Sequence, residues 1–245
     1  MTLLNLALAI PTSLIAVAIA SFFLVLAAPF ALLPRGSREK WIWWTNAGAS
    51  WAILKFALFV RNIEVLGREN LPEYGQPYLV VCNHRGFCDV LTLIWAARAE
   101  GISKRMVLYF PAMGLLGYLG GAVFFDREDH ADRMRAKQDA LFLLQRGVPL
   151  HVYPEGTRTR DGRLRSKVAL GMLVAASEAG IPLVPAAIWG TDDVIPPSNK
   201  GIRYFQDIRL HFSEALAPED FDSSQAHAEA AWEAVRAMVE DYEAP

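Results

Sequence analysis

The chain opens with a long apolar segment. No charged side chain occurs before Arg35, and residues 12–33 are almost entirely apolar. As a helix, this run would be about 33 Å long, enough to cross the hydrocarbon core of a bilayer. Pro29 falls near the end of the run and predicts that the helix bends or stops there. We therefore expect a membrane anchor at this end of the chain.

A cleaved signal peptide is the alternative interpretation of this segment. Ala27 and Ala28 would offer small residues at a cleavage site. However, residues 1–6 carry no positive side chain, and the apolar run is longer than a signal peptide needs. Both observations favour the anchor.

A short basic cluster and a second apolar segment follow. Arg35, Arg38 and Lys40 form the cluster, and the positive-inside rule places it in the cytoplasm. Residues 41–60 contain four tryptophans and a single charge, Lys55. Because tryptophan prefers the headgroup level, we expect an interfacial or re-entrant helix here. The alternative is a core helix of the following domain.

The remaining residues, 61–245, show the alternation of an α/β domain, so we expect the anchor to comprise residues 1–60. Short apolar runs predict strands at 78–82, 107–110, 122–125, 150–153, 183–188 and 208–212. Longer amphipathic runs predict helices at 89–98, 131–146, 168–179 and 225–242. Such alternation is typical of a mixed, mostly parallel sheet flanked by helices.

Composition excludes several classes of protein. Of the 245 residues, 53% are hydrophobic and 20% are charged, which excludes a disordered chain. The net charge of −2 excludes nucleic-acid binding through bulk positive charge. The two cysteines, Cys82 and Cys88, are too few for a disulfide scaffold and fit a reducing compartment.

A polar turn after the first predicted strand carries a histidine and an aspartate. His84 lies in the turn, and Asp89 would occupy the first turn of the next helix. With Gly86 easing the turn, the Asp89 carboxylate could hold one ring nitrogen and leave the other as a base. A zinc site that also uses the two cysteines is an alternative, but it lacks a usual ligand spacing. The cysteines are also the candidates for a covalent route, although we expect them to be small core residues.

Two further predicted strands end in charged residues. Glu155, Gly156, Thr157 and Arg158 follow the strand at 150–153, and Arg127 follows the strand at 122–125. Carboxyl ends of strands are where open α/β sheets bind ligands. A solvated turn explains either segment taken alone, but three such strand ends together predict a single site.

In combination, these motifs resemble the glycerolipid acyltransferase family, most of all its lysophosphatidate acyltransferases. Four segments match in order across about residues 63–212: Asn83-His84 with Asp89, the segment ending at Arg127, Pro154 to Arg158, and Val184-Pro185-Ala186. A basic residue before 107, Lys104 or Arg105, resembles a further phosphate ligand. The chain departs from the family at Gly86, where serine is frequent, and at 165–168, where a lysine-glycine pair is frequent.

This resemblance implies transfer of a fatty acyl group from acyl-CoA or acyl-carrier protein to the sn-2 hydroxyl of lysophosphatidate, with no cofactor and no metal. It implies that His84 and Asp89 are catalytic, and that Arg127, Arg158 and Arg105 bind the substrate phosphate. Asn83, Glu155, Gly156 and Thr157 would bind substrate, stabilise an oxyanion or have a structural role. The site is expected on the cytoplasmic face of the inner membrane.

Two alternatives stay open at this point. A different lyso-lipid, such as a lyso-aminolipid, could be the acceptor. A membrane-anchored protein that binds a lipid or an acyl carrier without turnover would carry the same fold, but it could dispense with His84.

Overall fold

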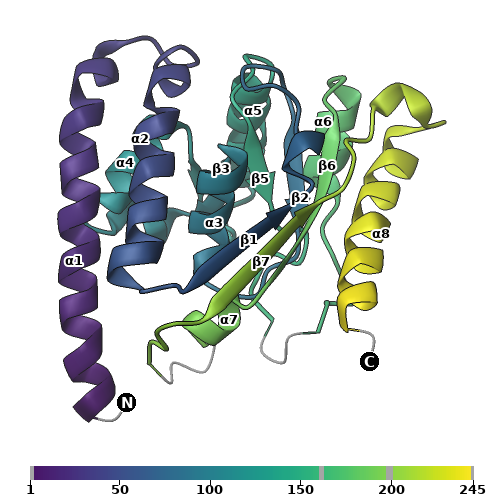
Figure 1. Cartoon of the computed structure of the whole chain (residues 1–245). Coiled ribbons are helices and arrows are strands. Elements are labelled where there is room, and N and C mark those ends of the chain that lie inside the picture. The colour runs from purple at the N-terminus through teal and green to yellow at the C-terminus, as the bar shows by residue number, and fades with distance from the viewer. Residues whose placement is uncertain (1–2, 160–162, 197–200, 244–245) are drawn as a thin grey trace.

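A computed structural model describes residues 3–159, 163–196 and 201–243 (Figure 1). Within these residues, seven strands form one mixed sheet in the order β1-β7-β6-β2-β5-β3-β4. The strands are β1 (Asn62–Leu66), β2 (Leu79–Cys82), β3 (Glu100–Lys104), β4 (Val123–Phe125), β5 (Leu150–Val152), β6 (Leu183–Trp189) and β7 (Asp207–Phe212). The helices are α1 (Leu3–Ala27), α2 (Arg38–Ala52), α3 (Cys88–Ala97), α4 (Met113–Gly120), α5 (His130–Leu144), α6 (Gly171–Glu178), α7 (Thr191–Val194) and α8 (Ser224–Glu243).

The direction of the strands decides which loops share an edge. β2, β3, β4, β5 and β6 run parallel to their neighbours, so their carboxyl ends meet at one edge of the sheet. β7 runs antiparallel to β6, and β1 is parallel to β7. The predicted class, a mixed and mostly parallel sheet flanked by helices, is confirmed.

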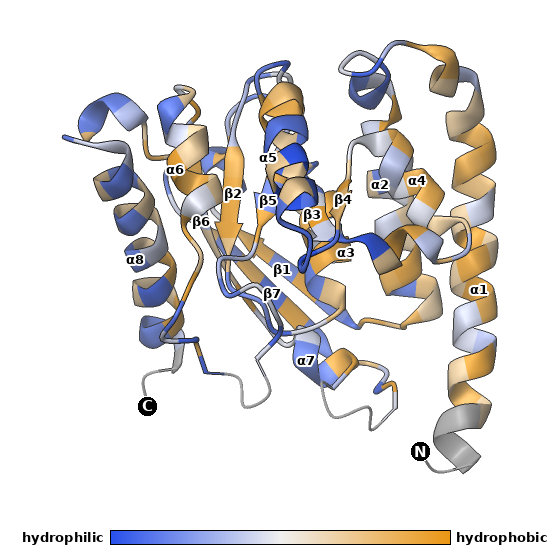
Figure 2. Cartoon of the chain, turned by 180° about the vertical axis from the view of Figure 1, so that it is seen from behind, coloured by the Kyte–Doolittle hydropathy of each residue, from blue (hydrophilic) through white to orange (hydrophobic). Residues whose placement is uncertain are grey.

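The side chains of β2 show that helices cover both faces of the sheet. Leu79 and Val81 belong to a core shared with α5, α6 and α8, whereas Val80 and Cys82 belong to a core shared with α3 and the segment after α2. Consecutive residues of a strand point to opposite faces, so a continuous apolar run is required where helices cover both sides. Figure 2 shows apolar strands between helices, of which α5 and α8 carry hydrophilic residues as well as apolar ones.

One predicted strand is wrong. Residues 107–110 do not form a strand, because Arg105–Tyr109 is a 3-10 helix. The strand in this part of the sheet is β3, whose sequence Glu-Gly-Ile-Ser-Lys is too polar to be recognised by apolar runs. Met106 and Tyr109 are exposed, so this apolar run does not belong to the sheet. The edge strand β1 was not predicted for the same reason, since it alternates polar and apolar residues.

The other predicted elements differ mainly at their ends. The helix predicted at 168–179 begins only at Gly171, because the backbone N–H of Ala169 donates to the Pro154 carbonyl instead of starting a helical turn. Ser223 caps α8 as expected, accepting the N–H of Ala226 at 3.1 Å.

The N-terminal helix lies along the domain instead of projecting from it (Figure 1). Together with the 3-10 turn Ala28–Leu32, it is the one helix in the described chain that is long and apolar enough to cross a membrane. Small residues, including Ala16 and Ala20, are buried, and Thr12 shares a 2.6 Å hydrogen bond with the Tyr204 hydroxyl. The α-helical part ends at Ala27, two residues before Pro29, as expected.

The tryptophan-rich segment is helical and has two different faces. In α2, Ile42 and Asn46 are buried where the helix packs against α3 and α4, whereas Trp41, Trp44 and Trp51 are exposed. A π-helix, Ile53–Ala57, continues it. One face therefore packs as a core helix does, and the other presents the aromatic residues of an interfacial helix. The division into an anchor of residues 1–60 and an enzyme domain stays a prediction.

Candidate active site

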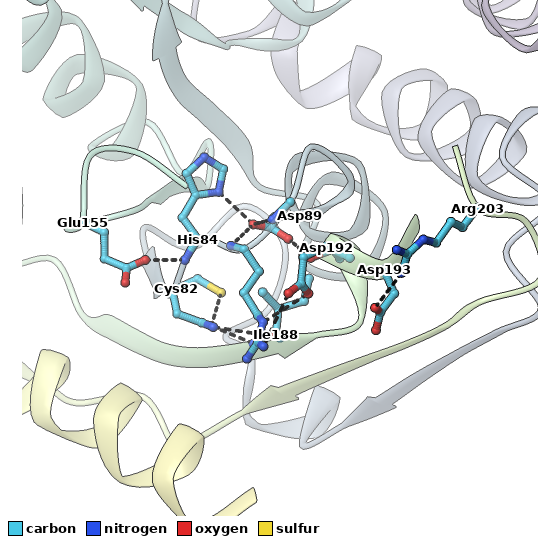
Figure 3. A network of polar contacts seen from close by, with 12 residues as sticks. Cys82, His84, Asp89, Glu155, Ile188, Asp192, Asp193 and Arg203 are labelled. Atoms are coloured by element: carbon cyan, nitrogen blue, oxygen red, sulfur yellow. Dashed lines mark hydrogen bonds and ion pairs between the residues drawn. The ribbon is translucent and has the colours of Figure 1, made fainter. Parts of the chain in front are cut away.

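The centre of the site is a histidine–aspartate pair between β2 and α3. The His84 Nδ1 lies 2.7 Å from Asp89 Oδ2 (Figure 3). β2 ends at Cys82 and α3 begins at Cys88, so the pair has the turn-and-first-helical-turn arrangement expected from the five-residue spacing. The predicted contact is confirmed.

Asp89 is held as a hydrogen-bond acceptor from several sides. It is fully buried, and its Oδ2 also accepts the backbone N–H groups of Arg85 at 2.7 Å and Gly86 at 2.9 Å. Its other oxygen accepts the hydroxyl of Thr191 in α7. With both oxygens accepting, the carboxylate can orient the imidazole so that Nδ1 carries the proton.

The other nitrogen of His84 is available for chemistry. Nε2 has no hydrogen-bond partner among the described residues, and the side chain is 16% exposed. The ring stacks on Tyr153 from the end of β5, with centroids 4.0 Å apart and planes 12° apart. The Asp89 bond and the Tyr153 stack together fix the plane of the imidazole. Sequence analysis missed this role of Tyr153.

Gly86 allows the approach of Thr191 to Asp89. A Cβ added at position 86 would lie 2.6 Å from the carbonyl carbon and oxygen of Thr191. Real Cβ atoms do not approach backbone so closely, so a serine here would push α7 away from the pair. Asp192, the next residue, forms an ion pair with Arg85 at 3.2 Å. Thr191 and Asp192 lie more than 100 residues from the motif, and no sequence signal had marked them.

Glu155 joins the loop after β5 to the histidine loop. Its carboxylate oxygens accept the backbone N–H of His84 at 2.7 Å and that of Arg165 at 3.1 Å. Burial raises the pKa of Glu155, and the two backbone hydrogen bonds oppose that shift. The His84 carbonyl in turn accepts the N–H of Thr159 at 3.0 Å. The 165–168 segment, which departs from the family pattern, therefore contributes here through its backbone.

Asn83 ties two strands together. Its side-chain nitrogen donates to the Ile188 carbonyl at 3.0 Å, and its oxygen accepts the Ile188 N–H at 2.8 Å. The backbone N–H of Gly156 donates to the Tyr153 carbonyl at 2.9 Å. Both groups had been considered as oxyanion donors, and in the structure both are already used within the fold. Thr157 and Arg158, which follow Gly156, are exposed.

The three arginines lie at different distances from the histidine. Arg158 is close enough to α3 for its charge to oppose the rise that burial causes in the pKa of Cys88. Arg127 follows β4, three strands from β2, which is about 14 Å along the sheet at ordinary strand spacing. Arg105 follows β3 and pairs with Asp132 at 2.6 Å. All three belong to the carboxyl edge of the sheet, and the charge of Arg158 acts on Cys88, the residue before Asp89.

The cysteines are core residues. Cys82 and Cys88 are both fully buried, and burial raises the pKa of each thiol well above its ordinary value. Neither therefore has the thiolate character that a nucleophile requires. Within the described residues, no group of three or more His, Cys, Asp or Glu could hold a metal ion.

His151 is fully buried, and only one of its ring nitrogens has a hydrogen-bond partner in the described structure. Its Nδ1 lies 2.9 Å from the Ala99 carbonyl, but its buried Nε2 has no partner in the described structure. Burial lowers its pKa to about 4. The ring is therefore neutral at physiological pH, so the core holds no unpaired charge at this position.

Comparison with known proteins identifies relatives of this chain. A family model described as Acyltransferase matches residues 62–189. The chloroplastic 1-acyl-sn-glycerol-3-phosphate acyltransferase LPAT1 of Arabidopsis thaliana is 30% identical over 188 residues, covering 76% of this chain and 52% of that protein. The human 1-acyl-sn-glycerol-3-phosphate acyltransferase alpha is 32% identical over 139 residues, covering 56% and 48%. This chain thus spans about half the length of these curated relatives.

A solved structure shares nearly the whole fold. The crystal structure of the 1-acyl-sn-glycerophosphate (LPA) acyltransferase PlsC from Thermotoga maritima matches with a TM-score of 0.77 and 26% sequence identity. The match covers 96% of each chain, so it includes the N-terminal helices as well as the sheet.

Proposed function

This chain belongs to the Acyltransferase family, and we propose that it is an O-acyltransferase acting on lysophosphatidate. It would move a fatty acyl group from acyl-CoA or acyl-carrier protein to the sn-2 hydroxyl and so produce phosphatidate for phospholipid synthesis. The observation that carries the proposal is the His84–Asp89 pair, with Nδ1 held at 2.7 Å and Nε2 free among the described residues. The names of the relatives support the choice of acceptor.

The reaction uses the pair as a general base. His84 Nε2 takes the proton of the lipid hydroxyl while Asp89 stabilises the imidazolium that forms. The hydroxyl oxygen attacks the thioester carbonyl, and the carbon–sulfur bond of the tetrahedral intermediate then breaks. The thiolate leaves easily because its conjugate thiol has a pKa near ~8.5, and the imidazolium returns the proton to it. The lipid hydroxyl is the nucleophile, so no covalent enzyme intermediate is needed.

The acceptor phosphate is placed by arginine. A phosphate monoester in a partly buried site requires paired cations, and the guanidinium fork matches phosphate oxygens. Arg158 is the first candidate because its charge acts on Cys88, the residue before Asp89, and Arg127 would meet the more distant part of the headgroup. With Asn83 and Gly156 already engaged, the exposed Thr157 is the donor we assign to the oxyanion.

The chain would act at a membrane. The exposed apolar side chains of α1, among them Leu14 at 65% and Val25 at 71%, support attachment to a bilayer. The basic residues Arg35, Arg38 and Lys40 support a cytoplasmic location for the following domain. The acceptor and the product are both lipids of that membrane.

The test is product identification. Purified protein in detergent is incubated with a labelled acyl thioester and a panel of lyso-lipids that includes lysophosphatidate and a lyso-aminolipid. We expect label to enter phosphatidate, and the His84→Ala variant to give none while keeping its fold by circular dichroism. Equal lipid binding by wild type and variant without any product would instead support the non-catalytic binding protein. Preferred labelling of the lyso-aminolipid would identify a different acceptor.

A further inference from the structure

A cleft that is separate from the candidate active site lies between α2 and α3. Its volume is about 290 Å³, close to the lower end of small-molecule sites. Trp43, Gly48 and Trp51 of α2 line it together with Trp95 of α3, Arg68 and Arg98. Arg98 follows the last residue of α3, whereas Asp89 lies in its first turn, so about 14 Å of helix separates the cleft from the site.

Two arginines are held over tryptophan rings in this cleft. The guanidinium of Arg68 lies 5.6 Å from the centroid of the Trp95 ring, and that of Arg98 lies 4.3 Å from the Trp43 ring. Stacking of this kind orients a guanidinium and leaves the edges that carry its N–H donors free. The rings therefore position the two cations without neutralising them.

Neither cation has an anionic partner in the described chain. No carboxylate of the described residues lies within ion-pair distance of Arg68 or Arg98, and the bond from Arg68 to the Trp95 carbonyl is long, at 3.5 Å. Burial and then the charge of Arg98 lower the pKa of Arg68. Two like charges facing one cleft repel each other, and an anion between them would remove that repulsion.

The backbone at Arg98 supports a specific role for its side chain. Arg98 has φ +53° and ψ +26°, the left-handed conformation that glycine or asparagine adopts at the end of a helix with less strain. The strained residue is the one whose guanidinium lies over Trp43. Strain of this kind indicates a function for the residue that bears it.

Aromatic side chains connect the cleft with an exposed apolar surface that a bilayer could cover. Trp51 lines the cleft, is 39% exposed, and packs edge-on against Phe56, which is 55% exposed. Trp44, two turns closer to the start of α2, is also exposed. Tryptophan at such a surface lies at the level of the lipid headgroups, where phosphates are found.

We propose that this cleft binds the phosphate of an anionic membrane phospholipid between Arg68 and Arg98. The two guanidinium groups donate to the phosphate oxygens, and Trp51 and Phe56 contact the glycerol and the first part of the acyl chains. The site is separate from the acyl-transfer site and would fix how α2 and α3 sit against the membrane.

The experiment measures lipid binding by the full-length protein in detergent micelles. Phosphatidylglycerol or phosphatidylcholine with brominated acyl chains is titrated in, and quenching of tryptophan fluorescence is recorded. Phosphatidylglycerol is used because it is neither the proposed acceptor nor the proposed product. The test variant combines Arg68→Gln with Arg98→Asn, since asparagine tolerates positive φ, and Arg236→Gln on α8 is the matched control, removing a charge that pairs with Glu233 and Glu240.

We expect wild type and Arg236→Gln to bind phosphatidylglycerol about tenfold more tightly than phosphatidylcholine, and the double variant to lose that preference. The His84→Ala variant should keep the preference, which separates this site from the proposed reaction. Retention of the preference by the folded double variant would overturn the proposal. Inorganic phosphate that competes with phosphatidylglycerol at equal concentration would assign the cleft to free phosphate and overturn the lipid assignment.

Discussion

At the scale of single residues, the site depends on the hydrogen bonds that the Asp89 carboxylate accepts. Its oxygens accept hydrogen bonds from His84, Arg85, Gly86 and Thr191, and only the bond to His84 acts directly in the proposed reaction. The others hold the carboxylate in place and keep it an acceptor. The geometry of the candidate site is therefore a property of the loop and of α7, and not of two residues alone.

The Asp89→Asn variant tests this dependence. Asparagine keeps the size of the side chain but can present an NH₂ group to His84, which would favour the wrong tautomer. We expect the kcat for acyl transfer to fall on the order of 10³-fold, with an unchanged circular dichroism spectrum. Cys88→Ala, in the same helical turn, is the control and should keep most activity. A folded but inactive Cys88→Ala protein would point to a thioester intermediate instead.

The arginine that meets the acceptor phosphate can be identified by comparing two lysine variants. Lysine keeps the charge but loses the planar fork of arginine. Because the charge of Arg158 acts on Cys88, the residue before Asp89, Arg158→Lys should raise the KM for lysophosphatidate by roughly ten- to a hundredfold, the equivalent of one charge-assisted hydrogen bond. Arg127→Lys should raise it less.

The control for the arginine variants is the KM for the acyl thioester, which should change little in both. Steady-state kinetics with each substrate varied in turn give the two constants. An acceptor KM that is unchanged in Arg158→Lys, or equally raised for a lyso-lipid without phosphate, would contradict the assignment.

At the scale of elements, α2 is attached to the sheet through a buried polar contact. Asn46 of α2 donates to Glu100 at the start of β3 and to the Leu116 carbonyl at 3.2 Å. Glu100 is 4% exposed, and its second oxygen has no partner in the described structure. Burial raises its pKa from 4.5 to about 8, so the carboxyl is mostly protonated at neutral pH.

This contact predicts a pH dependence of stability. Between pH 4.5 and about 8, the unfolded chain releases the Glu100 proton and the folded chain retains it. The folded state therefore binds more protons, and the free energy of unfolding should decrease as pH rises through this window, by up to a few kcal/mol. Glu100→Gln should remove this decrease in denaturant titrations at several pH values. The exposed Glu73→Gln variant is the control, and a slope that persists in Glu100→Gln would show that other groups cause it.

At the scale of the whole molecule, the candidate active site lies at the carboxyl edge of the sheet, and the apolar helices pack together on one side of the domain. α1 and α2 pack on each other and on α4, and the outer surface of α1 stays apolar (Figure 2). Thr12 and Tyr204 join α1 to the segment that leads into β7. Because β7 begins at the carboxyl edge of β6, this junction lies at the same edge of the sheet as His84.

Charges on the outer surface of α1 should detach the protein from membranes. Leu14 and Val25 are exposed, so Leu14→Lys with Val25→Lys should leave the fold intact and remove apolar area that a bilayer would cover. We expect the double variant to move from the membrane pellet to the supernatant after cell fractionation. The variant Leu14→Met with Val25→Ile is the matched control. A lysine variant that stays fully in the pellet would contradict attachment through this surface.

Features that depend on residues close together in the chain could be predicted from the sequence. β2 and α3 are encoded by an apolar run and a helical run, and the five residues from His84 to Asp89 are few enough that the turn between them brings the two side chains together. The apolar α1 and its end before Pro29 are local in the same way. The polar strand β3 was missed because its place in the sheet comes from pairing with β4 and β5, not from its own composition.

The contacts between segments that lie far apart in the sequence became visible in the three-dimensional fold. Thr191 reaches Asp89, Tyr153 stacks on His84, and Glu155 binds the His84 backbone, because parallel strands far apart in sequence end at one edge. Asn83 had been considered for catalysis, yet the adjacent β6 occupies its amide through Ile188. A residue's type shows which bonds it can form, but the packing of the sheet decides which partner is within reach, since hydrogen bonds require contact at about 3 Å.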